Sequence, residues 1–184
     1  MWEWLASQFL RQLFYYAEVL YVCKYDGKTK QECIDIALDS ELKTMRLLEE
    51  MYPKRQFQSR HYDKECFLKG DISDNKDEFW EVKDDSRICE TDNVFLEDVS
   101  AEGYPGWLHY CQAKYLCVID QTKEMLYILD FPRIQKKYRL LAKRVPSKGG
   151  YGYVIPLETL RKKRLLLSEN SYYLDEWGEP WLMI

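Results

Sequence analysis

A helix-capping pattern, followed by closely spaced turn signals, restricts this chain to a fold that mixes helices with short strands. Thr29, with Glu32 three residues later, forms a capping box. The helix that it predicts runs to about Met51, because Pro53 cannot continue a helix. The chain beyond this helix is rich in short apolar runs separated by turn residues.

Glu41 falls on the apolar stripe of this predicted helix. It lies seven residues after Ile34 and seven before Leu48, which is close to two helical turns in each direction. A carboxylate that faces inward is costly unless it is paired or used. We therefore expect either a buried ion pair or a functional role for Glu41.

Alternating and apolar runs predict the remaining elements. We expect a short helix at 107–113 and two basic helices at 133–143 and 157–167. Strands are expected at 65–73, 78–83, 93–99, 114–119, 125–130 and 151–155. The tail from about residue 169 gives no clear signal. Three strands in succession, then a helix and a returning strand, predict an α/β fold with an αβββαβ core, in which helices flank a mixed sheet.

The strand at 78–83 places charged side chains on one face. Side chains alternate along a strand, so Glu81 and Lys83 share a face with Phe79. If strand 65–73 pairs with it through the turn at 74–77, strand twist brings Asp71 close to Glu81. Asp71, Glu81 and the carbonyl of Val82 would then form a hard oxygen site of the kind that suits Mg²⁺.

These residues resemble the catalytic motif of the PD-(D/E)XK superfamily, the restriction-endonuclease-like nucleases. The resemblance covers roughly residues 32–130, and the superfamily core has the order αβββαβ. It implies a Mg²⁺-dependent nuclease, with Mn²⁺ as a substitute, that acts on DNA. Asp71 and Glu81 would hold the metal, and Lys83 would assist attack by water. Glu41 matches the helix glutamate that often precedes this motif.

Further positions match the same superfamily. Gln112 or Lys114 matches the polar residue that often lies on the helix after the third strand, and Gln112 would support catalysis. Asn93 and Glu97 resemble an N-x-x-x-E pattern in the third strand of phage and bacterial members. The proline that often precedes the first aspartate is replaced by Gly70.

The charge of the chain is divided between its two ends. Between Arg133 and Arg164, eleven Lys or Arg residues face a single acid, Glu158, while the net charge of the whole chain is −4. Such asymmetry suits a polyanionic partner, although a solvated helix face carries similar charge. The candidate phosphate contacts are Arg133, Lys136, Lys137, Arg139, Lys143, Arg144, Arg161, Lys162, Lys163 and Arg164.

The organisation that we expect is one domain, 1–184, in three parts. An amphipathic helix occupies 1–28, the nuclease-like core 29–130, and basic helices with an acidic, aromatic tail 131–184. Residues 1–24 lack the pattern of a signal peptide and are interrupted by charges, so we expect a cytoplasmic protein that does not enter a membrane. The six cysteines are interpreted as reduced and mostly buried, and no pattern indicates zinc.

Two other functions remain open from the sequence. One is a nuclease-like protein without catalysis, such as a phage accessory protein or inhibitor, that engages nucleic acid or a host protein. Its contacts would come from exposed aromatic side chains: Trp2, Trp4, Tyr15, Tyr16, Trp177 and Trp181. The other is an α/β domain whose acidic hairpin and basic helices have no catalytic role. A homodimer is compatible with all of these functions.

Overall fold

The computed structural model describes residues 30–63, 66, 68–100, 103–147 and 150–183. The chain divides into two compact units, Met1–Ile36 and Ala37–Ile184. The expected helix at 1–28 and the Thr29 cap lie outside the described residues. The second unit contains every described strand and the larger part of the helix at 30–51.

The helix predicted from the capping pattern is confirmed. α2 spans Lys30–Met51 and carries Glu32 in its first turn. Within the second unit, its buried side chains include Leu47 and Leu48, which pack against the main sheet. Glu41 is buried as its place on the stripe predicts.

The main sheet is mixed and has seven strands in the order β1-β2-β3-β5-β6-β9-β10. All neighbouring strands are antiparallel except β3 and β5, which are parallel. The strands are β1 (Phe57–Ser59), β2 (Ile72–Asp74), β3 (Phe79–Asp84), β5 (Tyr115–Asp120), β6 (Met125–Asp130), β9 (Leu166–Leu174) and β10 (Pro180–Leu182).

A second, smaller sheet lies beside the first. It has three antiparallel strands in the order β4-β8-β7, namely β4 (Asn93–Val99), β8 (Tyr151–Pro156) and β7 (Lys143–Pro146). The remaining helices are α3 (Ile88–Thr91), α4 (Trp107–Tyr110), α5 (Phe131–Leu141) and α6 (Leu157–Lys162).

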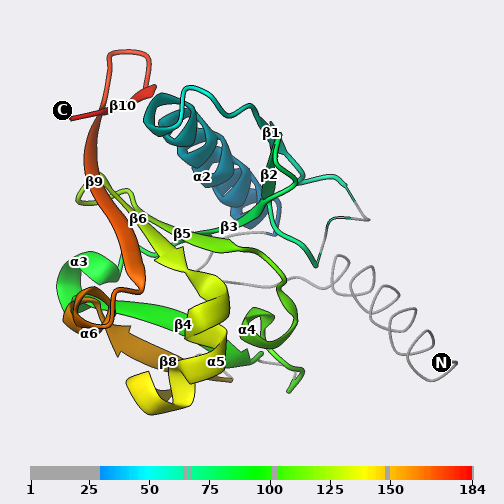
Figure 1. Ribbon diagram of the computed structural model, residues 1–184, viewed down its shortest axis with the longest axis vertical. Coiled ribbons are helices and arrows are strands. Elements are labelled where there is room, and N and C mark those ends of the chain that lie inside the picture. Colours follow the sequence, from blue (N-terminus) through cyan, green and yellow to red (C-terminus); the bar gives the residue numbers. More distant parts are fainter. Residues whose placement is uncertain (1–29, 64–65, 67, 101–102, 148–149, 184) are drawn as a thin grey trace, which may run out of the picture. The chain divides into compact units, whose positions relative to one another are not determined.

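Two apolar cores lie on opposite faces of the main sheet. Trp80, Cys117 and Ile128 alternate inward toward α2 on one face. Leu116 and Leu129 point to the other face, where the small sheet and α5 cover them. Within the second unit, Figure 1 shows α2 on one side of the sheet and α5, α6, β4 and β8 on the other. The result is a layered α/β fold, as the sequence predicts.

The expected αβββαβ succession is interrupted, because α3, β4 and α4 lie between β3 and β5. The predicted strand at 65–73 is wrong for the described residues of its first part, because Cys66, Leu68 and Lys69 form turns and β2 begins only at Ile72. The chain can approach β3 here because Gly70 has a φ of 143° and lies against the carbonyl of Trp80. β1, which the sequence did not reveal, completes the antiparallel trio with β2 and β3.

The strand at 93–99 is present but does not join the main sheet. β3 pairs directly with β5, and β4 pairs with β8 in the small sheet. Apolar side chains of β4 such as Val94 and Leu96 face the same core as Leu116. β4 therefore forms part of a layer that covers the main sheet, although its alternating pattern is equally typical of a strand within it.

The C-terminal part differs most from expectation. The predicted helix at 157–167 ends at Lys162, and Arg164 has a φ of 53° that turns the chain into β9. β9 pairs with β6 along the main sheet and buries Tyr172 in the core on the α2 side. Residues 131–184 therefore contribute strands to both sheets.

The described residues bear on the predictions about membrane crossing and about the cysteines. No described helix has the length and apolar character that a membrane crossing requires. Cys66, Cys111 and Cys117 are buried free thiols, while Cys33 and Cys89 are partly exposed free thiols.

Candidate functional site

The β2–β3 hairpin brings Asp71 to the side of β3. The Asp71 amide donates to the carbonyl of Trp80 at 3.0 Å, and the Val82 amide donates to Asp71 Oδ2 at 2.8 Å. The carboxylate is thus held against the backbone between Glu81 and Lys83. The expected approach of Asp71 to the E-V-K strand is present.

Glu81 and Lys83 lie on the same face of β3, as the alternation predicts. Lys83 Nζ lies 2.5 Å from Glu81 Oε1. The Cys111 thiol donates to Glu81 Oε2 at 3.4 Å. Glu81 is only 7% exposed, so both of its oxygens have partners in a nearly closed environment.

The charges of this cluster interact strongly. Burial, reinforced by the negative charge of Glu81, raises the pKa of Asp71 to about 7. Burial lowers the pKa of Lys83, but the charges of Glu81 and Asp71 outweigh it and raise that pKa well above its ordinary value. Lys83 therefore stays protonated, and it offsets the repulsion between the two carboxylates.

Glu41 has a hydrogen-bond partner, His61, that the sequence did not identify. Its oxygens lie 2.9 Å and 3.1 Å from Nδ1 of His61. Burial raises the pKa of Glu41, and the hydrogen bond from His61 opposes that effect. The charge of Lys83 lowers the pKa of Glu41 and the charge of Glu81 raises it, so the α2 carboxylate lies near the β3 cluster. Glu41 is therefore both paired and close to the candidate site.

Helix α4 and the residue that follows it form another wall of the site. Lys83 Nζ lies 5.2 Å from the centre of the Trp107 ring, a cation–π contact. Burial raises the pKa of Tyr110 to about 12, and Glu81 contributes to the rise. Burial also raises the pKa of Cys111, which keeps the thiol protonated and able to donate to Glu81. The sequence predicts a short helix at 107–113 here, but it could not specify that Trp107 would contact Lys83 on β3.

The other supporting residues are dispersed. Gln112 is exposed, and its backbone N–H donates to the carbonyl of Leu68 at 2.7 Å. Lys114 pairs with Glu78 at the base of the hairpin turn. Asn93 donates from its side chain to the carbonyl of Thr91, at the start of β4. None of these three interactions involves the Asp71–Glu81–Lys83 cluster.

Glu97 lies nearer to the site than Asn93 does. It occupies β4 and contributes to the raised pKa of Tyr110, which also responds to Glu81 and Lys83. The backbone of Glu97 also lies against Gly106, directly before α4. Of the N-x-x-x-E pair, the glutamate thus borders the wall made by α4.

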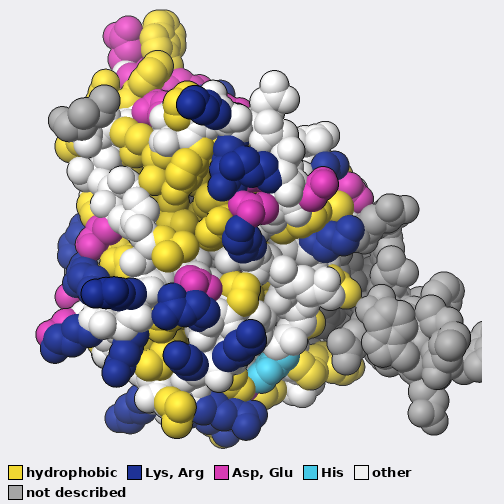
Figure 2. Space-filling model, in the orientation of Figure 1, with side chains coloured by type: hydrophobic (Ala, Val, Ile, Leu, Met, Phe, Trp, Pro, Cys, Tyr) yellow, Lys and Arg dark blue, Asp and Glu magenta, His cyan; other side chains and the backbone are white. Residues whose placement is uncertain are grey.

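The predicted phosphate contacts lie on α5, β7 and α6 or directly after α6, and all of them are exposed. Figure 2 shows Lys and Arg side chains gathered over the region that α5, α6 and β8 occupy in Figure 1. Several are paired with acids: Arg133 with Asp130, Arg144 with Asp98, Arg161 with Glu169 and Lys162 with Glu158. Lys136, Lys137 and Lys163 form no ion pair with any other described residue.

The oxygen donors of the cluster fit a small divalent cation in type. Asp71 and Glu81 are carboxylates on either side of the Val82 backbone, and a positive ion would relieve their repulsion. Among the described residues, no three His, Cys, Asp or Glu side chains converge on one point. Mg²⁺ is commonly held by one or two carboxylates, with water and phosphate oxygens as its other ligands, so a two-carboxylate set is sufficient.

The fold and the cluster define a layered α/β protein with a carboxylate–lysine site on a hairpin of its main sheet. No protein-family model matches the chain, and no curated protein matches it significantly. The solved structure of D212, a nuclease from a fusselovirus, is similar with a TM-score of 0.40 and 16% identity. The match covers 74% of this chain and 91% of that chain. This similarity is too distant to assign a fold family or a function.

Proposed function

We propose that the chain is a metal-dependent phosphodiesterase that cleaves DNA at the Asp71–Glu81–Lys83 cluster. One observation carries the proposal: the Val82 amide holds the Asp71 carboxylate beside Glu81, and Lys83 pairs with Glu81 on the same strand. Two carboxylates and an ammonium group that meet in a largely buried position are typical of a site for phosphate chemistry.

The arrangement of the strands supports the same proposal. α2, the antiparallel strands β1, β2 and β3, and the parallel strand β5 are similar to the αβββαβ core of the superfamily that the motif resembles, with α3, β4 and α4 between β3 and β5. The acids and the lysine occupy the hairpin of this core. Glu41 reaches the cluster from α2, the helix that precedes it.

The roles of the residues follow from their contacts. Asp71, Glu81 and the carbonyl of Val82 would hold Mg²⁺ or Mn²⁺. The bound ion would lower the pKa of a water molecule and polarise the phosphate. Lys83, as a protonated amine, orients the water and offsets charge that develops on the phosphate. Glu41 would add negative charge near Lys83 from α2.

The basic surface on α5, β7 and α6 would bind the phosphate backbone. Lys136, Lys137 and Lys163 carry charges that no described acid neutralises. Phosphate contacts of this kind position a nucleic acid without reading its sequence. Binding is therefore expected to weaken as the salt concentration rises.

A cleavage assay with purified protein tests this proposal. We expect the wild-type protein to cut DNA only when Mg²⁺ or Mn²⁺ is added, and Asp71→Asn, Glu81→Gln and Lys83→Ala each to reduce the rate by about 100-fold or more. Lys76→Ala, on the exposed hairpin turn, is the matched control and should retain full activity. Undiminished cleavage by Lys83→Ala would remove the lysine from the mechanism.

A binding protein without catalysis is the second candidate, and one observation favours it. Both oxygens of Glu81 already have partners in Lys83 and Cys111, so the carboxylate is satisfied without a metal. Calorimetry with Mn²⁺ separates the two functions. Heat of binding that disappears in Glu81→Gln supports the enzyme, whereas DNA binding with neither Mn²⁺ binding nor cleavage supports the binding protein.

A further inference from the structure

A buried carboxylate of the small sheet contacts two basic side chains. Asp98 on β4 is only 8% exposed. Its Oδ1 lies 2.7 Å from His109 Nε2, and its Oδ2 accepts from Arg144 Nε at 3.0 Å. His109 and Arg144 are both exposed to solvent, so the buried Asp98 carboxylate fixes the positions of two surface groups.

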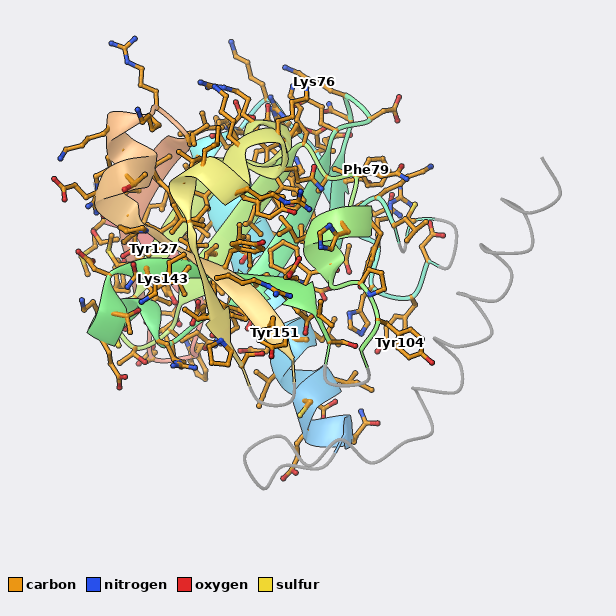
Figure 3. All side chains as sticks on the ribbon, turned by 90° about the horizontal axis from the view of Figure 1, so that it is seen from below. Lys76, Phe79, Tyr104, Tyr127, Lys143 and Tyr151 are labelled. Atoms are coloured by element: carbon orange, nitrogen blue, oxygen red, sulfur yellow. The ribbon has the colours of Figure 1, made fainter. Side chains whose placement is uncertain are left out.

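Tyr151 lies against Arg144, one of these two groups. The Arg144 guanidinium carbon lies 4.3 Å from the centre of the Tyr151 ring, so the two groups are stacked closely. Tyr151 is nevertheless 47% exposed. It is the first residue of β8, and Figure 3 shows it well separated from Lys76 on the hairpin turn. We name His109, Arg144 and Tyr151 the Tyr151 platform.

Helix α4 connects the Tyr151 platform to the candidate active site. Trp107 and His109 belong to this one-turn helix. Trp107 contacts Lys83 of the active-site cluster, and His109 contacts Asp98 beneath the platform. A helix rises only about 1.5 Å per residue, so α4 holds the residue that contacts Lys83 and the residue that contacts Asp98 within one helical turn of each other.

We propose that the Tyr151 platform docks a single-stranded segment of nucleic acid and directs it toward the Asp71–Glu81–Lys83 cluster. The inference rests on the proposed function for the destination of the strand, but not for its binding. Arg144 and His109 supply donors for phosphate, and the Tyr151 ring supplies a face on which a base can stack. Bases in a duplex are already stacked, so this aromatic contact requires an unpaired base.

The surroundings of the platform suit a polyanion. Arg139 contacts the ring of Tyr138, which in turn packs against His109 and Tyr153. Lys143 begins β7, the strand that carries Arg144. Among the residues that the structure describes, the acid in direct contact with the platform is Asp98, which is buried and lies against His109 and Arg144. A structural tie between β4, α4 and β7 explains Asp98, but it gives no role to the half-exposed ring of Tyr151.

Fluorescence anisotropy with a labelled oligonucleotide tests the proposal. Measurements use the full chain with Lys83→Ala and EDTA, so that cleavage cannot interfere, and compare a single strand with the duplex of the same sequence. Tyr151→Ala should weaken single-strand binding by about 5- to 100-fold and duplex binding by less than about twofold. Tyr151→Phe retains the ring and should bind as the parent does.

Tyr173→Ala is the matched control. Tyr173 is 45% exposed but lies on β9, and its loss should leave both affinities unchanged. A melting temperature within a few degrees of the parent shows that each variant is folded. Equal losses for single strand and duplex, or no loss for Tyr151→Ala, would overturn the inference.

The outcome is separable from that of the proposed function. Metal-dependent cleavage by the wild-type protein, combined with unchanged single-strand binding by Tyr151→Ala, retains the enzyme and removes the platform. Loss of single-strand binding in Tyr151→Ala, combined with no cleavage under any metal, retains the platform and removes the enzyme.

Discussion

Arg55 binds two carboxylates of the β2–β3 hairpin, Asp74 and Glu78. The side chain of Asp74 is fully buried, so removal of Arg55 leaves a buried carboxylate whose remaining hydrogen bonds come from the backbone amides of Lys76 and Glu78. We expect Arg55→Met to lower the free energy of unfolding by about 3 kcal/mol, as measured by urea denaturation. Lys114→Met removes a half-exposed partner of Glu78 and should cost less than about 1 kcal/mol. Similar losses in the two variants would contradict this assignment.

Glu78 makes the stability of the same hairpin depend on pH. Burial raises the pKa of Glu78, but hydrogen bonds from Lys114 and Arg55 outweigh burial and lower it below its usual value of 4.5. The folded state then binds fewer protons than the unfolded state, so this stabilisation is complete above pH 4.5 and is lost as the pH falls through the folded pKa. Urea unfolding between pH 3 and 6 should show a smaller acid loss in Glu78→Gln than in the wild-type protein. Parallel pH profiles would exclude this role.

Single residues were predictable where local periodicity decides their direction. The burial of Glu41 follows from the phase of α2, and the shared face of Glu81 and Lys83 follows from strand alternation. The partner of Glu41 was not predictable, because His61 lies in a loop and no local pattern connects it to α2. The same is true of Cys111, which follows β4 and α4 in the sequence, so no local pattern connects it to Glu81 on β3.

Among the elements, those with a strong periodicity of apolar residues were predictable from the sequence, and the short or polar elements were not. α2, β3, β5, β6, α5 and β8 all carry clear apolar patterns and are present. β1 and β7 are short, and β9 alternates exposed with partly buried residues over most of its length. Their extended form depends on a neighbouring strand that supplies hydrogen bonds, which a single segment cannot reveal.

Helix α4 provides a test at the level of the element. A Cβ on Gly106 would overlap the backbone carbonyl of Glu97, which cannot rotate away. We expect Gly106→Ala to displace α4, to cost about 1–3 kcal/mol of stability and to slow any metal-dependent cleavage through Trp107 and Lys83. Denaturation and the cleavage assay measure the two effects. Unchanged stability and activity would show that β4 and α4 can separate without consequence.

For the whole molecule, the sequence predicts a core at 29–130 and a C-terminal addition at 131–184, and truncated chains test this division. A fragment that ends at Asp130 lacks β9, which pairs with β6, and loses Phe131, Ile134 and Tyr172 from the two cores. We expect this fragment to show no cooperative thermal transition by circular dichroism. A chain that ends at Leu174 keeps β9 and should still unfold cooperatively, because β10 pairs with β9 alone. A cooperatively folded 1–130 fragment would restore the division expected from the sequence.

The parallel pairing of β3 with β5 also has a consequence for how the chain reaches its native state. The strands of the β2–β3 hairpin and of the β5–β6 hairpin are close in sequence. β3 and β5, in contrast, are separated by residues 85–114, which include α3, β4 and α4. Contacts between distant segments carry the larger loop-closure entropy, so we expect the two hairpins to form early and the β3–β5 seam to close late. Pulse-labelled amide exchange would show that order as later protection of β3 and β5 at their shared edge. Asp71 and Glu81 would then come together in a local hairpin, while the wall that encloses them would be added in one of the last steps of folding.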